Sequence, residues 1–163
     1  MANGLAVPPA QGAGGDPVAC DASQPPCPAG GLLRIHHAAI ICSDYAVSRH
    51  FYTAVLGLPV LAEHYRTARD SWKLDLQLPD GSQVELFSMP QAPQRPSYPE
   101  ACGLRHLAFA VSDLQAWVAY LSGQGVALEA VRLDDYTGQR FVFFQDPDQL
   151  PLELYEVAAV TRP

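Results

Sequence analysis

The sequence predicts an α+β protein built from two tandem βαβββ modules, and three observations carry this prediction. His37 is followed by Glu85 after 48 positions, and His106 is followed by Glu153 after 47. The text around each histidine repeats as well, since H-A-A-I-I-C-S-D begins at His37 and H-L-A-F-A-V-S-D begins at His106. Each glutamate lies in an apolar run, V-E-L-F in one case and L-E-L-Y in the other. Repetition at a fixed spacing indicates that one structural unit is used twice.

The first module is expected over residues 33–89. Residues 35–42 carry apolar side chains on both faces, which predicts a buried strand. Ser43 or Asp44 offers an N-cap for a helix with apolar residues at helical spacing, and Gly57 ends that helix. A Pro-Asp-Gly turn joins the last two strands of the module. The three predicted strands after the helix are 59–66, 71–78 and 83–88.

The second module is expected over residues 103–157, after a linker at 90–102 whose four prolines exclude a helix or a central strand. A strand is predicted at 104–111. Ser112 or Asp113 then caps a helix that ends at Gly123 and Gly125. An Asp-Pro-Asp turn precedes the last strand. The three strands predicted after this helix are 127–133, 139–145 and 150–157.

Residues 1–30 differ from the rest, because they contain no Lys or Arg and are dominated by Ala, Gly and Pro. This composition predicts a disordered tail ahead of a single domain at 31–163. The tail lacks the basic start and apolar stretch of a secretory signal, so the cytoplasm is the expected location. Free thiols are therefore expected rather than disulfides, Cys20 and Cys27 of the tail included.

The bulk charge restricts the partners. A formal net charge of −7 argues against nucleic acid or an anionic membrane surface, since both require clustered Lys and Arg. No apolar run approaches the roughly 18–20 residues that a membrane span needs. A small-molecule substrate is the expected partner.

The repeated residues predict a metal site. Side chains alternate along a strand, so His37 shares its face with Ala39 and His106 shares its face with Ala108. The opposite face of each strand can pack the helix. Both histidines then point to the open side of their sheets, each with a small residue beside the imidazole.

Glu85 and Glu153 lie in apolar runs, where an unpaired carboxylate loses several kcal/mol of solvation. One divalent cation bound by two imidazoles and two carboxylates compensates this cost. Ni²⁺, Co²⁺, Mn²⁺ and Fe²⁺ suit such a set, and Zn²⁺ is possible. The alternative is that the histidines are satisfied core residues and the glutamates pair with arginines such as Arg34 or Arg105. The match in two modules favours the metal.

These residues resemble the vicinal-oxygen-chelate superfamily, which contains glyoxalase I, bleomycin-resistance proteins, extradiol dioxygenases and fosfomycin-resistance thiol transferases. The resemblance covers nearly all of residues 33–157. It implies a half-open, barrel-like cleft formed by the two modules, and a homodimer. One histidine and one glutamate in each module is similar to the glyoxalase I type, which implies His37, Glu85, His106 and Glu153 as ligands. The motifs that carry it are H-H-A-A-I-I-C-S-D-Y-A-V-S-R-H-F-Y-T-A-V-L-G-L, G-L-R-H-L-A-F-A-V-S-D and F-F-Q-D-P-D-Q-L-P-L-E-L-Y-E.

The expected function is that of a glyoxalase I-like lyase or isomerase acting on a small α-hydroxycarbonyl or thiol adduct through a metal-stabilised enediolate. Glu153 first, and Glu85 second, is the expected base that moves a proton between neighbouring carbons. The alternatives are a drug-sequestering binding protein without chemistry and an Fe²⁺-dependent dioxygenase. Whether the two histidine–glutamate pairs meet within one chain or across two is left open.

Two features depart from that pattern. Gln149 stands where the family commonly has glycine in a turn. No glutathione-binding set can be identified either, although the stretch 69–76 and Arg140 offer polar groups toward the cleft. Ordinary charge pairing on a solvated strand face explains those groups equally well.

Overall fold

The computed structural model describes residues 31–89 and 91–158. The chain divides into two compact units, Met1–Leu33 and Arg34–Pro163, and all helices and strands of the described residues belong to the second. The tail at 1–30, with the disorder and the thiols predicted for it, lies outside the described residues.

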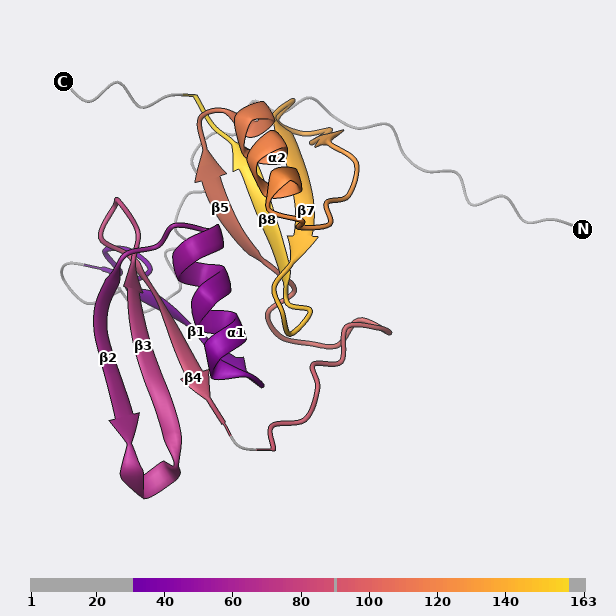
Figure 1. Cartoon of the computed structure of the whole chain (residues 1–163). Helices are drawn as coiled ribbons and strands as arrows, with labels where there is room; N and C mark the ends of the chain where they lie inside the picture. Colours follow the sequence, from indigo (N-terminus) through magenta and orange to yellow (C-terminus); the bar gives the residue numbers. More distant parts are fainter. Residues whose placement is uncertain (1–30, 90, 159–163) are drawn as a thin grey trace, which may run out of the picture. The chain divides into compact units, whose positions relative to one another are not determined.

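The first module folds in the order strand, helix, strand, strand, strand (Figure 1). Its sheet has the order β1-β4-β3-β2, in which β1 runs parallel to β4 and the other neighbours are antiparallel. Its elements are β1 (His37–Cys42), α1 (Tyr45–His50), the π-helical turn η1 (Phe51–Val55), β2 (Val60–Arg66), the 3₁₀ turn η2 (Thr67–Arg69), β3 (Ser71–Gln77) and β4 (Gln83–Ser88).

The second module repeats this topology with the sheet order β5-β8-β7-β6, again with one parallel and two antiparallel pairings. Its elements are β5 (Leu107–Val111), α2 (Leu114–Gly123), β6 (Arg132–Leu133), β7 (Arg140–Gln145) and β8 (Pro151–Glu156). The predicted fold class is confirmed: the protein is α+β, with two open four-stranded sheets built from equivalent modules.

Both helices begin at an aspartate of the repeated Ser-Asp pair. The Asp44 side chain accepts the backbone N–H of Val47 at 3.1 Å, and Asp113 accepts that of Ala116 at 2.9 Å. Each carboxylate thereby satisfies one of the free N–H groups at its helix start. Aspartate, not the preceding serine, is the N-cap in both modules.

Several predicted elements differ from the structure. The strand predicted to be buried at 35–42 begins at His37 and buries one face only, since Ile41 is 53% exposed, and the strand predicted at 104–111 begins at Leu107. The strand expected at 127–133 is reduced to Arg132–Leu133, with one isolated bridge between Leu128 and Phe144. An edge strand pairs on one side only, so irregular backbone costs it less than a central strand. The first helix also changes to a π-helical turn at Phe51, where the Leu56 N–H bonds the Phe51 carbonyl at 2.9 Å.

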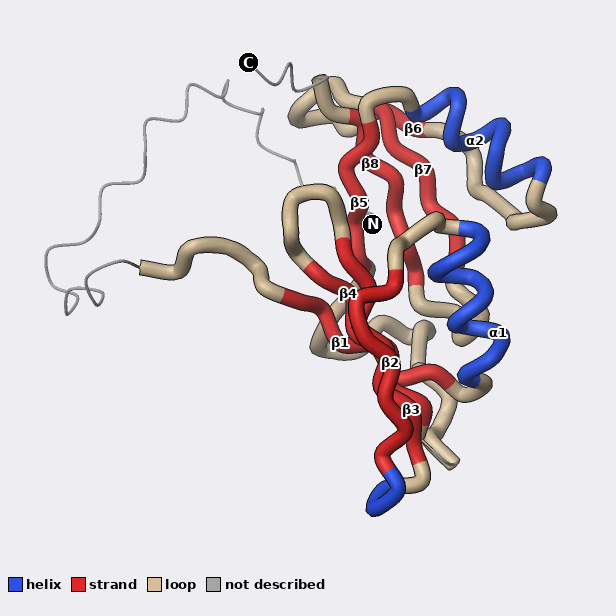
Figure 2. Tube along the Cα trace, turned by 60° about the vertical axis from the view of Figure 1, so that its left-hand side comes forward, coloured by secondary structure: helices blue, strands red, loops and turns tan. Residues whose placement is uncertain are grey.

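The helix-covered faces of both sheets contribute to one hydrophobic core. Ile40 and Leu86 of the first sheet and Val142 and Leu154 of the second all belong to it. Figure 2 shows α1 and α2 flanking the strands of their sheets. The prediction that the face opposite each histidine packs the helix is confirmed, and the histidine-bearing faces are left open.

Candidate metal half-sites and their surroundings

The first histidine–glutamate pair lies on the open face of the first sheet. His37 begins β1, and Glu85 lies on the neighbouring β4 directly opposite Ala39. The His37 Nε2 and Glu85 Oε2 atoms are 3.8 Å apart. Alanine at the facing position leaves room for the imidazole and the carboxylate to approach each other above the sheet.

The second pair repeats this geometry. His106 immediately precedes β5, and Glu153 on β8 lies opposite Ala108, which is again two residues after the histidine. The His106 Nε2 and Glu153 Oε2 atoms are 3.0 Å apart. Phe143 of β7 faces Glu153 from the other side and meets the His106 ring edge-on at 5.1 Å.

The two histidines present the same nitrogen to their carboxylates. With Nε2 toward Glu85, the His37 Nδ1 atom lies 2.9 Å from Nδ1 of His36. A hydrogen bond there keeps the Nε2 lone pair of His37 free for a cation when Nδ1 carries the proton. The His106 Nδ1 atom is buried and has no hydrogen-bond partner in the described part of the chain.

The two carboxylates differ in their surroundings. Glu85 Oε1 accepts a hydrogen bond from Lys73 Nζ at 3.0 Å, and the same ammonium also bonds Asp75. Burial opposes the charge on Lys73, but the bonds to Asp75 and Glu85 outweigh it and raise the Lys73 pKa above its ordinary value. Glu153 is only 7% exposed, and His106 is its one polar partner among the described residues.

Pairing with arginine, the alternative reading of the glutamates, does not occur at the two candidates. Arg34 donates to the backbone carbonyl of Asp80, and Arg105 pairs with Glu100. Within residues 31–89 and 91–158, the cationic or histidine partners of the two carboxylates are Lys73, His37 and His106, as described above.

Each predicted pair is brought together, but the two pairs do not meet. In the described part of the chain no group of three or more His, Cys, Asp or Glu side chains is placed to hold a metal ion. The reason lies in the packing: the helix-covered faces of the sheets share the core, whereas the ligand-bearing faces are open. One described chain therefore presents two half-sites, defined here as His37–Glu85 and His106–Glu153.

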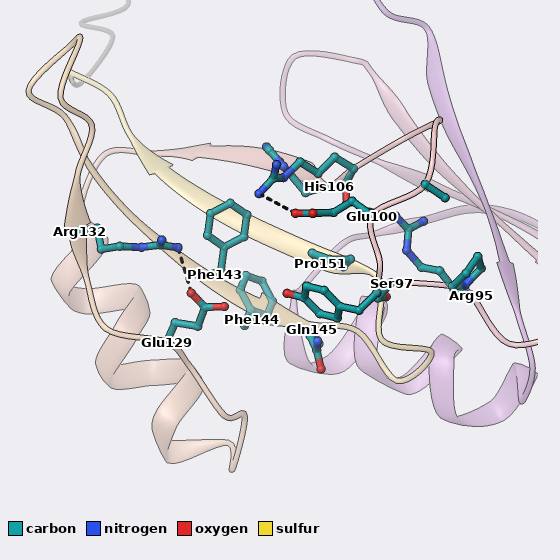
Figure 3. Close-up of a pocket in the computed structure, with 14 residues that line it drawn as sticks. Arg95, Ser97, Glu100, His106, Glu129, Arg132, Phe143, Phe144, Gln145 and Pro151 are labelled. Atoms are coloured by element: carbon teal, nitrogen blue, oxygen red, sulfur yellow. Dashed lines mark hydrogen bonds and ion pairs between the residues drawn. The ribbon is translucent and has the colours of Figure 1, made fainter. Parts of the chain in front are cut away.

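A pocket of about 460 Å³ adjoins the second half-site. Figure 3 shows His106, Phe143 and Arg132 among the side chains that line it, together with linker residues such as Arg95 and Ser97. The Arg132 guanidinium lies over the Phe141 and Phe143 rings at 5.0 and 5.3 Å and pairs with Glu129 at 2.9 Å.

Of three polar residues that were considered for the cleft, two lie on the open face of the sheet and one does not. Lys73 and Asp75 do share the open face with Glu85, because Asp75 lies opposite Glu85 in the β3–β4 register. Arg140 does not face that side: it lies on the helix-covered face of β7 and pairs with Glu156 at 2.6 Å. Sequence reasoning missed Arg66, whose place on the open face follows from alternation along β2 once the register with β3 is known.

The chain belongs to the Glyoxalase/Bleomycin resistance protein/Dioxygenase superfamily, because the sequence model of that family matches residues 34–154. Uncharacterized protein YaeR of Escherichia coli (strain K12) is 59% identical over 126 residues, which are 77% of this chain and 98% of YaeR. Uncharacterized protein YwkD of Bacillus subtilis (strain 168) is 55% identical over 125 residues, with the same shares.

Solved structures agree with this assignment. The glyoxalase family protein from Enterococcus faecalis is 48% identical, with a TM-score of 0.72 over 76% of this chain and 98% of that one. A glyoxalase I mutant from Zea mays, at 20% identity and a TM-score of 0.65 over 77% of this chain and 46% of that one, shares the fold. Among the described residues, no helix is both long and apolar enough to cross a membrane.

Proposed function

We propose that this protein is a metal-dependent lyase or isomerase of the glyoxalase I type, which acts on a small α-hydroxycarbonyl or thiol adduct. The observation that supports this most is the equivalence of the two half-sites: each glutamate lies opposite the alanine two residues after its histidine, and each histidine directs Nε2 at the carboxylate. If the four residues served only in packing, the two modules would not need to place them in the same way.

The half-sites fit a divalent cation in their chemistry. His37, Glu85, His106 and Glu153 together supply two nitrogen and two oxygen donors, a set that suits Ni²⁺, Co²⁺, Mn²⁺, Fe²⁺ or Zn²⁺. Glu153 is buried with a histidine as its one described polar partner, so a nearby cation compensates its lost solvation. Such an ion supplies Lewis-acid polarisation of two adjacent substrate oxygens when it is bound.

The arrangement that joins the half-sites is a homodimer with two-fold symmetry. In such a dimer the first half-site of one copy meets the second half-site of its partner, and symmetry then creates two identical four-ligand sites. Exposed apolar side chains beside the half-sites support this arrangement. Ile41 lies on the His37 face of β1 and is 53% exposed, and Leu104, close to His106, is 55% exposed.

Glu153 is the proposed base, and Glu85 is the second candidate. Moving a proton between neighbouring carbons requires a carboxylate that can turn toward the substrate. Glu85 is held by the hydrogen bond from Lys73 in addition to its nearby histidine, whereas Glu153 contacts only its histidine among the polar groups in the described part of the chain. Phe143, edge-on to His106 and opposite Glu153, covers one side of this pair.

Subunit complementation tests the shared site. His37→Ala and His106→Ala are each expected to lose tight metal binding. After unfolding and refolding as an equal mixture, heterodimers regain one intact site, so about a quarter of the wild-type metal content returns. Each variant refolded alone is the control. If the mixture gains no metal while the wild-type protein binds it, the sites do not form between chains.

The base assignment has its own test. Glu153→Gln and Glu85→Gln each remove one charge and keep the side-chain volume. In a methylglyoxal–thiol isomerisation assay on metal-loaded protein, Glu153→Gln is expected to abolish turnover, and Glu85→Gln to reduce it less. Full turnover by Glu153→Gln would show that the base is wrongly assigned.

One observation favours a second function, the binding of a small molecule without chemistry. The pocket beside His106 combines Phe143, Phe144 and Tyr98 with polar groups, as ligand-binding sites commonly do. The two functions differ in their metal requirement. A protein purified without chelators that holds no divalent ion, and takes up none on titration, supports the binding function.

A further inference from the structure

A second group of charged side chains lies on the open face of the first sheet, beside Glu85. Arg66 is at the end of β2 and Lys73 is on β3, and both cations approach the ring of Phe87 on β4. The Arg66 Cζ atom is 4.7 Å from the Phe87 ring centroid, and Lys73 Nζ is 5.7 Å from it. Phe87 follows Glu85 by two residues, so its ring lies on the same face as the half-site.

The Arg66 guanidinium is held in place by two kinds of contact. Its Nε and Nη2 atoms donate to the Ser71 hydroxyl at 3.1 and 2.7 Å, and Ser71 is only 2% exposed. The Phe87 ring supports the face of the guanidinium. These contacts fix the plane of the group, and three of its five N–H bonds are left for another partner.

Arg66 differs from the other held arginines in its charge balance. Arg49, Arg132 and Arg140 each have a carboxylate oxygen within 3.1 Å. No carboxylate lies within 4.0 Å of Arg66 in the described part of the chain, and its polar partner is a neutral hydroxyl. A fixed, part-buried guanidinium without a counter-charge is a ready site for an oxyanion, which it can bind through two parallel hydrogen bonds.

We propose that Arg66, with Lys73 beside it, binds an anionic group of the substrate. This inference rests on the proposed function and specifies its substrate class: a small molecule with two adjacent oxygens for the cation and a separate carboxylate or phosphate for Arg66. Glu85 contacts Lys73, and Lys73 and Arg66 both contact the Phe87 ring. The half-site and the Arg66 guanidinium therefore lie along one continuous surface, on which a single small molecule can contact both. The charge of Lys73 is already compensated by Asp75 and Glu85, so Arg66 supplies both the free positive charge and the direct bonds.

The second module does not offer the same site. Arg132 also lies over aromatic rings, but its guanidinium is already paired with Glu129. The anion subsite therefore belongs to the first module.

The first experiment uses metal-free, full-length protein and tests the subsite alone. Inorganic phosphate and, separately, succinate are titrated while the Arg Nε–Hε signals are followed by NMR. Saturable movement of the Arg66 signal is expected, together with at least about tenfold weaker binding in Arg66→Gln. The matched control is Arg69→Gln, which removes the same charge from an exposed arginine three residues away and is expected to change affinity less than twofold. The stronger of the two anions identifies the class of acidic group.

If Arg66→Gln and Arg69→Gln lost the same amount of anion affinity, general charge attraction would explain the binding and the proposal would be overturned. The absence of anion binding by the wild type would overturn it as well. Arg66→Lys separates fold from recognition, since it keeps the charge but cannot form the two parallel bonds. An intermediate affinity with unchanged urea unfolding is expected for it.

The second experiment joins the subsite to the metal site. Co²⁺-loaded protein is titrated with propionohydroxamate, which offers two adjacent oxygens, and with the monohydroxamate of succinate, which adds a carboxylate. The carboxylated probe is expected to bind about tenfold more tightly to the wild type and without advantage to Arg66→Gln. Equal binding of both probes to the wild type overturns the inference while the metal site stands. If neither probe binds but phosphate binding still depends on Arg66, the proposed function fails and the anion subsite stands.

Discussion

The substitution Tyr52→Phe isolates one polar contact between the modules. Tyr52 lies in η1 of the first module and is fully buried, and its hydroxyl donates to Asp146 of the second module at 3.0 Å. Asp146 is 5% exposed and also accepts the backbone N–H groups of Asp148 and Leu150 at 2.9 and 2.8 Å. Phenylalanine keeps the ring in the core and removes only the hydroxyl.

The expected cost follows from the partner's charge and burial. A hydrogen bond to a buried charged group contributes about 1.5–3 kcal/mol, and the two backbone donors remain to keep Asp146 partly satisfied. We expect the free energy of unfolding to fall by about 2 kcal/mol. With a urea dependence of roughly 2 kcal/mol per molar, the midpoint moves down by about 1 M. Urea unfolding followed by tryptophan fluorescence measures this shift.

The cost also depends on pH in a defined direction. Burial raises the pKa of Asp146, while the bonds from Leu150 and Tyr52 lower it. An aspartate with a raised folded-state pKa adds stability below its unfolded pKa, and this stability is lost as the pH rises through the folded pKa. Tyr52→Phe removes one bond to the charged form and raises the Asp146 pKa further. The loss in free energy of unfolding caused by Tyr52→Phe is therefore largest above the Asp146 pKa, and it becomes smaller as the pH falls through that pKa.

Tyr120→Phe is the control, because the Tyr120 hydroxyl also crosses between the modules but makes only a 3.4 Å contact with the Ala54 carbonyl at an exposed site. It is expected to change the unfolding free energy by less than about 0.5 kcal/mol. If Tyr52→Phe were equally mild, or if its cost grew as the pH fell, the buried carboxylate would not be stabilised as described.

Three further predictions concern the turn, the thiols and a helix start. Gln149 has a φ of 66°, a left-handed conformation that glycine adopts more easily than glutamine. Gln149→Gly is therefore expected to raise the free energy of unfolding by about 0.5–1 kcal/mol, as measured by urea unfolding. A decrease would mean that the Gln149 side chain stabilises the turn. Burial raises the pKa of the Cys42 thiol to about 11, whereas Cys102 is exposed. Iodoacetamide at pH 8 should therefore label Cys102 in the folded protein and Cys42 only after unfolding, and peptide mass spectrometry measures both. Asp113→Ala should cost about 1 kcal/mol through the lost N-cap, and Asp113→Asn should restore most of it.

Much of the fold was predictable because the signals are local. The caps at Asp44 and Asp113 follow from residue type and position, and strand alternation correctly assigned which faces are buried. The shortening of the strand near Arg132 was not predictable, since edge pairing depends on backbone contacts that the apolar pattern does not determine. The π-helical turn at Phe51 was not predictable for the same reason, because the apolar pattern does not determine its backbone hydrogen bonds.

The site was predictable only in part, for a related reason. The repeated spacing paired His37 with Glu85 and His106 with Glu153, and alternation along a strand gave the face of each histidine. It does not tell which face of one module packs against the other. That choice is made by the helix-covered surfaces, which share the core and leave the two half-sites apart within the described chain.

The repeat that makes the half-sites equivalent also makes their differences informative. The backbone register around Glu85 and Glu153 is the same, yet the facing residue on the third strand is Asp75 in one module and Phe143 in the other. The residue facing the glutamate is thus a carboxylate bonded to Lys73 in the first half-site, and an aromatic ring in contact with the histidine in the second. In the proposed function, this difference assigns recognition of the substrate to the first module and proton transfer to the second.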